Sequence, residues 1–317
     1  MRILVTGSRG MIGSALVRHL GESGDQVVRL VRDPAQNEAD SIPWDPASGE
    51  LAHSRVEEFD AVVHLAGHNL AAGRWTKARK AAIRDSRVRS TQLLCEALRR
   101  LDHPPEVLAS ASAIGIYGDR ASEVLTEETS LGTGFLAEVC RQWEAATRPA
   151  AEVGIRVVHL RFAIVLTADG GALARMLLPF RMGLGGVVGN GQQYWSWIAL
   201  EDALAAIRFV LVTGGVSGAA NLAAPEPVTN REFTRTLGAT LGRPTFFSIP
   251  AFVARTVFGE MADETLLAST RTMPAKLQAN GFRFRHSRLA GTLRSLLQNQ
   301  AGSPTRFVPE HHRKEPP

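Results

Sequence analysis

The sequence MRILVTGSRGMIG, residues 1–13, decides the fold of this chain. The apolar run Ile3–Val5 has the composition of a buried strand, and the apolar residues that follow Gly13 recur with the period of a helix. Between the two lies a turn, Thr6–Gly13, that contains three glycines spaced three residues apart. The pattern predicts a strand, a glycine turn and the start of a helix in immediate succession.

Each glycine of this turn has its own physical use. Gly7 permits a tight turn, Gly10 permits close approach of a ligand, and Gly13 lets the helix pack against the strand. A helix N-terminus presents free backbone N–H groups to an anion, so the turn predicts binding of a dinucleotide pyrophosphate. A merely structural strand-to-helix turn is the alternative. We expect the ligand to contact Gly7, Ser8, Arg9, Gly10, Met11, Ile12 and Gly13.

Length and composition limit the class of protein. The 317 residues suffice for one large α/β domain, or for a core domain with a smaller lobe. No apolar run is long enough to span a membrane, and the chain starts with a strand rather than a signal sequence, so we expect a cytoplasmic protein. Two cysteines in helical patterns favour a reducing compartment.

The formal net charge is +5, which indicates either a solvated basic surface or attraction for a phosphorylated ligand. No basic stripe interleaved with aromatic residues and no zinc-binding spacing occurs, so we expect no nucleic-acid partner and no metal site. The sequence leaves the oligomeric state open between a monomer and a homodimer.

Strands and helices alternate through the first half of the chain. Helices are expected near residues 11–23, 76–100 and 134–153, and the polar stretch 37–56 is expected to be a surface excursion. Alternation of this kind predicts an α/β fold with a Rossmann-type doubly wound parallel sheet. The apolar runs suited to its buried strands are Ile3–Val5, Val27–Val31, Ala61–Leu65, Val107–Ser110 and Ile155–Leu160.

The second half has a different organisation. Glycine-rich stretches interrupt a segment near 165–200 that is expected on the substrate side, and a helix at 201–212 and a strand at 219–223 are expected to return to the sheet. Helices are then expected at 230–241, 251–258 and 263–269. We therefore expect a dinucleotide-binding domain over 1–228, a small, mainly helical C-terminal lobe over 229–297, and a disordered tail over 298–317.

The residue at the tip of the second strand indicates which dinucleotide binds. An acidic residue there suits the ribose hydroxyl of NAD, whereas an arginine suits the 2′-phosphate of NADP. Arg32 occupies that position and Arg9 is a second phosphate partner, so we predict NADP(H). A shift by one residue would place Asp33 there instead and favour NAD. The third strand ends at Leu65, Ala66 and Gly67, which are expected to form a wall against the cofactor.

Several motifs together resemble a known family. They are Thr6–Gly13, Leu65–Gly67, Arg74–Thr76, Ser110–Gly118, Trp195–Ile198 and Ala224–Asn230. With them the chain resembles, from residue 1 to about 297, the atypical "epimerase family" or YfcH-like branch of the extended short-chain dehydrogenases/reductases. The resemblance implies an NADP(H)-binding Rossmann domain whose C-terminal helical lobe closes over a substrate cleft. It also implies that Arg87 reaches the cofactor, with an ordinary helix salt bridge as the alternative.

The chain departs from the superfamily at its catalytic pair. These enzymes normally use a Tyr-x-x-x-Lys helix, but Ala121 stands four residues after Tyr117 and Ile198 stands four after Tyr194. The remaining candidates for moving a proton are Ser112, Tyr117 and Glu138. Packing or substrate contact is the alternative for Tyr117, and solvent exposure on a helix is the alternative for Glu138.

Two functions are consistent with these features. The first is an NADP(H)-dependent oxidoreductase or epimerase-like protein with a small-molecule substrate that the sequence does not identify. The second is a non-catalytic NADP(H)-binding sensor or scaffold protein, which would keep the glycine turn and lack the Tyr-Lys pair. Epimerisation of sugar nucleotides is disfavoured because the tyrosine is absent.

Overall fold

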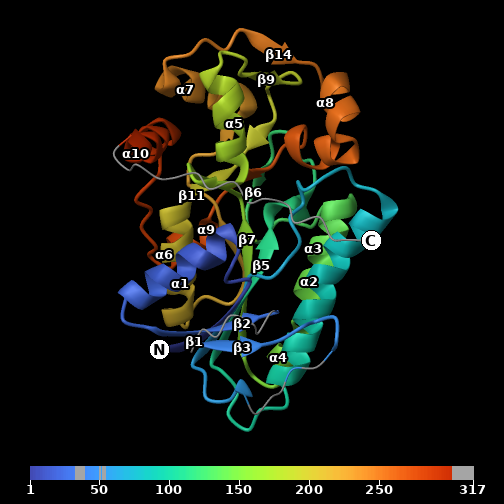
Figure 1. The fold of residues 1–317 in the computed structure, drawn as a ribbon, viewed down its shortest axis with the longest axis vertical. Helices are drawn as coiled ribbons and strands as arrows, with labels where there is room; N and C mark the ends of the chain where they lie inside the picture. Colours follow the sequence, from blue (N-terminus) through green and yellow to red (C-terminus); the bar gives the residue numbers. More distant parts are fainter. Residues whose placement is uncertain (33–39, 50, 52–54, 302–317) are drawn as a thin grey trace, which may run out of the picture.

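A computed structural model describes residues 1–32, 40–49, 51 and 55–301. Seven strands form one sheet in the order β12-β7-β5-β4-β1-β2-β3, and every neighbouring pair is parallel (Figure 1). The order reverses between β1 and β4, which is the switch point where ligands bind in doubly wound sheets. The strands are β1 (Arg2–Thr6), β2 (Gln26–Val31), β3 (Ser41–Pro43), β4 (Ala61–His64), β5 (Val107–Ala113), β7 (Arg156–Phe162) and β12 (Gly218–Leu222).

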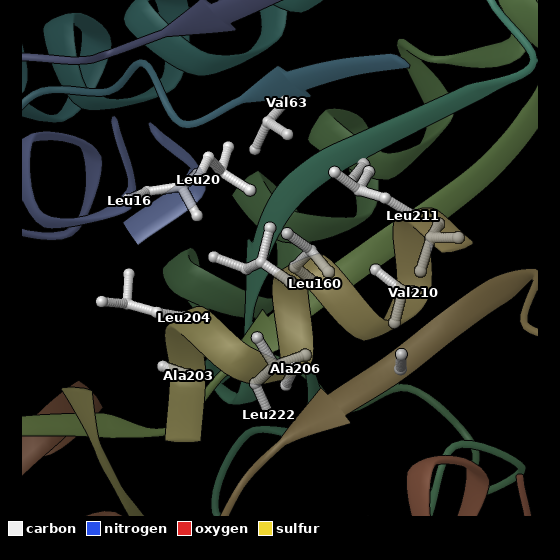
Figure 2. Close-up of a cluster of buried hydrophobic side chains, with 14 of the residues drawn as sticks. Leu16, Leu20, Val63, Leu160, Ala203, Leu204, Ala206, Val210, Leu211 and Leu222 are labelled. Carbon is white, nitrogen blue, oxygen red and sulfur yellow. The ribbon is translucent and has the colours of Figure 1, made fainter. Parts of the chain in front are cut away.

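Helices cover both faces of this sheet. On one face lie α1 (Met11–Glu22) and α6 (Leu200–Val212), and on the other lie α2 (Lys77–Leu98), α3 (Phe135–Ala145) and α4 (Arg148–Glu152). Figure 2 shows α6 packing Leu204 and Val210 among side chains from the sheet and from α1. The expected doubly wound Rossmann-type fold is thereby confirmed.

Two details of the first half differ from the sequence expectation. The stretch expected as a surface excursion contains β3, which pairs with β2 and extends the sheet at its edge. The single helix expected at 134–153 is divided into α3 and α4, because Pro149 has no N–H to donate and begins a new helix in the first turn of α4.

Most of the remaining elements form a second cluster beyond the carboxyl ends of the central strands, whereas Leu277 of α9 packs with β12 in the main core. Figure 1 places α5, α7, α8, β9 and β14 together at that end of the molecule. Their shared core includes Leu173, Phe180, Trp195, Trp197 and Phe233. The remaining elements are β6 (Val124–Leu125), β8 (Ile164–Thr167), α5 (Gly171–Arg181), β9 (Gly186–Val188), β10 (Tyr194–Trp195), β11 (Trp197–Ala199), β13 (Val228–Thr229), α7 (Asn230–Leu241), β14 (Phe247–Ile249), α8 (Ala251–Phe258), η3 (Ala262–Leu266), β15 (Arg271–Thr272), α9 (Ala275–Ala279) and α10 (Leu289–Ala301).

The helix expected at 263–269 is a short π-helical segment, η3. The expected tail at 298–317 is helical over its first residues, because α10 ends at Ala301, and residues 302–317 lie outside the described residues. Within the described parts of the chain, even the long helix α2 does not combine the length and the apolar character that crossing a membrane requires.

Candidate functional site

A cavity of about 850 Å³ opens at the carboxyl ends of β1, β2 and β4. The glycine turn lies at its base, and one face of α2 forms a side wall. The main lining segments are Thr6–Gly10, Leu30–Arg32, Trp44–Ala47 and Leu65–Asn69, together with Ala72, Arg79, Ala82, Asp85, Ser86, Arg89 and Ser90. The cavity therefore lies at the switch point, beside the predicted dinucleotide motif.

The glycine turn is packed too tightly for larger residues. Gly7 has a φ of 67°, and a Cβ on it would lie 2.6 Å from the carbonyl carbon of Leu65. A Cβ on Gly13 would lie 2.1 Å from the oxygen of Gly7. These contacts hold the start of α1 close against the ends of β1 and β4.

Gly10 is the N-cap residue of α1, and it has no side chain that could accept hydrogen bonds from the first turn. The N–H groups of that turn are consequently available to an anion. The hydroxyl of Ser8 is buried and has no hydrogen-bond partner among the described residues. A phosphate group in the cavity would supply the missing acceptors, so these residues fit a dinucleotide.

A buried histidine, His64, connects the strands next to the glycine turn by hydrogen bonds. Oγ1 of Thr6 lies 2.7 Å from Nδ1 of His64, and the N–H of Leu65 donates to the same Oγ1 at 3.2 Å. On the other side of the ring, Oγ of Ser90 lies 3.4 Å from Nε2. Burial lowers the pKa of His64 to about 4, so the ring is neutral at physiological pH. His64 thus joins β1, β4 and α2 without adding charge.

Positive charge gathers around this cavity. Arg9, Arg32, Arg79 and Arg89 all line it. The pKa of His68 is lowered, first by burial and then by the charges of Arg32, Arg79 and Arg87. Arg32 is exposed at the tip of β2, whereas Asp33, the residue that would favour NAD, lies outside the described residues.

Arg87 is held by carbonyl groups. Its guanidinium donates to the oxygens of Ile83 and His68, at 3.1 and 3.0 Å, and lies over the ring of Trp143. The described residues contain no carboxylate that pairs with it, so the alternative of an ordinary helix salt bridge is not found. Arg87 packs beside Gly67, where a Cβ would lie 3.3 Å from its Cζ.

Of the predicted cofactor contacts, those that line the cavity are Gly7, Ser8, Arg9, Gly10, Arg32, Leu65, Ala66 and Gly67. Four others do not line the cavity: Met11, Ile12, Gly13 and Arg87. The Met11 and Ile12 side chains pack against the core below α1. Met11 also approaches the start of α5, where a Cβ on Gly171 would lie 3.0 Å from its sulfur.

Tyr117 lies in the short 3-10 helix η2 (Ile114–Tyr117) and is completely buried. Its hydroxyl donates to Oδ1 of Asn221 at 2.8 Å and accepts from Nη1 of Arg161 at 2.9 Å. Burial raises the pKa of this hydroxyl above its ordinary value, although the charge of Arg161 opposes the rise. Both hydrogen-bonding functions of the tyrosine are therefore occupied by protein groups.

Ser112, on β5, belongs to the same network. Its hydroxyl donates to Oε1 of Glu144 at 2.7 Å, and Arg161 donates to both oxygens of that carboxylate at 2.8 Å. Burial opposes ionisation of Glu144, but the hydrogen bonds and charge of Arg161 hold its pKa below the ordinary value. The network brings Ser112 and Tyr117 together through Glu144 and Arg161, outside the lining of the cavity.

Glu138 does not join this network. It is exposed on α3, where it pairs with Arg141 and accepts a hydrogen bond from Gln142 at 2.7 Å. The structure therefore places this carboxylate in solvent on the helix surface. Trp195 and Trp197 are buried in the C-terminal core, and Ser196 between them donates to the oxygen of Thr270.

Sequence reasoning missed the residues that complete this network: Glu144, Arg161 and Asn221. Arg161 and Asn221 lie near the ends of neighbouring strands, β7 and β12, and their alignment is visible only in the register. An arginine near the end of a strand in the middle of the sheet is a signal that could have identified Arg161, since such a residue needs a buried partner.

Comparisons with known proteins agree with this geometry. A model of the NAD dependent epimerase/dehydratase family matches residues 3–223. The chain belongs to this family. A domain of unknown function (DUF1731) matches residues 249–296, within the C-terminal part. The expected membership of the epimerase-family branch of short-chain dehydrogenases/reductases is confirmed by relatives that carry the same description.

One such relative is epimerase family protein Mb2239 of Mycobacterium bovis, 43% identical over 92% of this chain and 96% of the relative. The human epimerase family protein SDR39U1, solved with NADPH, is 33% identical with a TM-score of 0.87, covering 94% of this chain and all of that chain. A nucleoside-diphosphate sugar epimerase from Corynebacterium glutamicum is 34% identical with a TM-score of 0.76. That match covers 98% of this chain and 63% of the other.

Proposed function

We propose that this family member is an NADP(H)-dependent oxidoreductase that acts on a small molecule. The observation that carries the proposal is the cavity at the glycine turn, where an uncapped helix N-terminus and several arginines face a space of about 850 Å³. The human relative, 33% identical over almost the whole chain, was solved with NADPH.

The proposal assigns the phosphates to specific groups. The N–H groups of the turn and of the first turn of α1, with the hydroxyl of Ser8, would hold the pyrophosphate. Arg32 and Arg9 would hold the 2′-phosphate, because a planar guanidinium can make two hydrogen bonds to it. Leu65, Ala66 and Gly67 would form the backbone wall, and Arg87 would support that wall from behind through its bond to the oxygen of His68.

Bound NADPH supplies a hydride to a carbonyl carbon, and NADP⁺ accepts one from an alcohol carbon. This chain must then handle the accompanying proton, and Ser112, Tyr117 and Glu138 remain the candidates. Ser112 and Tyr117 could do so only by exchanging a present partner, Glu144 or Asn221, for substrate. Glu138 would have to leave Arg141.

The engagement of Ser112, Tyr117 and Glu138 with protein partners favours a second candidate function, a non-catalytic NADP(H)-binding sensor or scaffold. A protein of this kind needs the cofactor site and has no use for a free tyrosine hydroxyl. Accumulation of the bound cofactor without its consumption would be its signature.

We also propose a division into an NADP-binding domain at 1–228 and a helical lobe at 229–297. The boundary precedes α7, and DUF1731 falls within the proposed lobe. A cytoplasmic location is supported by Cys95 and Cys140, which are both buried and unpaired, as is usual in reducing compartments.

The test is fluorescence titration of the purified protein with NADPH and NADH. We expect NADPH to bind more tightly, and Arg32→Ala to remove about tenfold or more of the preference for NADPH. Arg18→Ala, which removes an exposed arginine of α1, is the matched control and should leave the preference unchanged. Equal affinities of the wild type for the two cofactors would contradict the NADP(H) assignment.

Turnover separates the two functions. Consumption of NADPH with any member of a panel of aldehydes and ketones supports the oxidoreductase, whereas tight binding without consumption supports the sensor. We expect little or no activity on UDP-sugars. Robust turnover of a UDP-sugar would show that another residue replaces the missing tyrosine.

A further inference from the structure

Arg79 stands in the first turn of α2 and lines the cavity together with Asn69 and Ala72. Its Nη2 donates to the oxygen of Asn69 at 2.9 Å. Its Nε is buried and has no hydrogen-bond partner among the described residues. The side chain thus bounds the cavity while one of its N–H groups remains unsatisfied.

An unsatisfied buried N–H is costly, because it has lost its water and gained no acceptor. Two other arginines of this protein avoid that cost. Arg161 has two bonds to Glu144, and Arg156 donates to three backbone oxygens. The arrangement at Arg79 would be relieved by a ligand that is rich in acceptor oxygens.

The position of Arg79 indicates which oxygens these are. In the sheet, β1 lies between β2 and β4. Arg32 follows β2, whereas Asn69, to which Arg79 is bonded, follows β4. The two arginines therefore reach the cavity from the two strands that flank β1, and the charges of both lower the pKa of His68.

The wall of α2 supports the same placement. Arg79, Ala82 and Ser86 recur at helical spacing and line the cavity along one face of the helix. Ser8, in the glycine turn, also lines the cavity, and its buried hydroxyl has no hydrogen-bond partner among the described residues. An anion at the base would have Ser8 beneath it and a cation on the α2 side.

We propose that Arg79 binds the pyrophosphate of the dinucleotide from the α2 side, opposite Arg32. This inference rests on the proposed cofactor and adds a residue that the sequence did not indicate. On binding, the guanidinium turns so that its unsatisfied N–H, which protein atoms cover in this structure, donates to a pyrophosphate oxygen. The contact is independent of the 2′-phosphate.

That independence makes the proposal testable, because NADPH and NADH share the pyrophosphate and differ at the 2′-phosphate. Arg79→Ala should weaken the binding of both cofactors by the same factor, about tenfold to a hundredfold. Arg32→Ala should weaken the binding of NADPH and leave the binding of NADH unchanged. Arg79→Lys, which keeps the charge and loses the planar fork, should fall between the wild type and Arg79→Ala.

The control is Lys77→Ala, which removes an exposed positive charge from the same end of α2, two residues away. Affinities come from fluorescence titration, and thermal unfolding of each variant without cofactor establishes that the fold is intact. Lys77→Ala should bind both cofactors as the wild type does. If it weakens them as much as Arg79→Ala, the effect is long-range charge and the proposed contact is wrong.

Two further outcomes overturn the inference. Unchanged affinities in a folded Arg79→Ala variant would show that the side chain does not contact the cofactor. Selective loss of NADPH binding would place Arg79 at the 2′-phosphate instead. A wild-type protein that binds neither cofactor would contradict the proposed function itself, which is a distinguishable failure.

Discussion

Arg161 and Glu144 form an ion pair through two parallel hydrogen bonds of 2.8 Å, with the side chains only 6% and 12% exposed. The pair joins β7 to α3 and holds both Ser112 and Tyr117. Charges this well buried are tolerated because both carboxylate oxygens accept hydrogen bonds and the guanidinium donates to Glu144 and to Tyr117, so removal of one partner leaves a buried charge unpaired. The pair is consequently the centre of the network at the end of β5.

We predict that Arg161→Met lowers the free energy of unfolding by about 3–5 kcal/mol, because it leaves the carboxylate of Glu144 buried without its ion-pair partner. Urea unfolding measures the loss. The matched control is Arg255→Ala, which breaks a 2.8 Å pair with Asp263 whose side chains are about half exposed. That variant should lose less than about 1 kcal/mol. Similar losses in the two variants would contradict the assigned importance of burial.

Tyr117→Phe tests the hydroxyl that stands between Arg161 and Asn221. We predict a loss of about 1–3 kcal/mol of stability, because both partners become unsatisfied, and an unchanged affinity for NADPH. Urea unfolding and cofactor titration supply the two measurements. If stability is kept while NADPH consumption is abolished, the tyrosine acts on substrate and its structural role is minor.

The outline of the fold could be predicted because its signals are local. The apolar runs, the helical periods and the glycine turn each lie within one short stretch of chain. β3 was not predicted because it has only three residues, none of them is buried, and one is a proline at the sheet edge. A strand of this kind exists because β2 offers it a partner, which no local pattern reveals.

The lining of the cavity at the glycine turn could be predicted for the same reason, whereas the network at Tyr117 could not. Tyr117 was correctly placed at the carboxyl end of the sheet, but its partners lie 44 and 104 residues away. Hydrogen bonds over such separations depend on sheet register and on the packing of α3. The sequence therefore identified the tyrosine as a proton donor candidate without indicating that its hydroxyl is already engaged.

Two glycines of α1 are predicted to respond in opposite ways to alanine. In Gly13→Ala the new Cβ would lie 2.1 Å from the oxygen of Gly7, so the turn must shift and stability should fall by about 3 kcal/mol or more. Gly21→Ala meets nothing within 4 Å and should gain up to about 1 kcal/mol of helix propensity. Thermal unfolding compares the two. A stable Gly13→Ala variant that still binds NADPH would refute the assigned role of this glycine.

The burial of His64 predicts a loss of stability in acid. Its pKa is lowered from 6.5 to about 4, so between these values the unfolded chain binds a proton that the folded protein excludes. The free energy of unfolding should therefore fall as the pH drops below 6.5, by about 1.4 kcal/mol per pH unit. The lowered pKa of His159 adds to the effect in the same direction.

Urea unfolding across this pH range measures the slope, and His64→Gln should reduce it. His103→Gln, at an exposed position, is the control and should keep the slope of the wild type. An identical pH dependence in His64→Gln and the wild type would assign the acid sensitivity to other groups.

Glu264 connects the C-terminal part to α3. Its carboxylate accepts from the N–H groups of Phe135 and Leu136, each at 3.0 Å, and so caps a helix whose N-cap residue, Gly134, has no side chain. A carboxylate at a helix N-terminus is favoured by both the hydrogen bonds and the helix dipole. We predict that Glu264→Ala destabilises the start of α3 by about 1–2 kcal/mol. Hydrogen exchange should show faster exchange at Phe135 and Leu136, with Glu264→Gln intermediate because its amide oxygen can accept one bond.

Glu232→Ala, which removes an exposed acidic residue in the first turn of α7, is the control and should leave the exchange of these two amides unchanged. Unchanged exchange at Phe135 in Glu264→Ala would show that this contact does not hold the C-terminal part against α3.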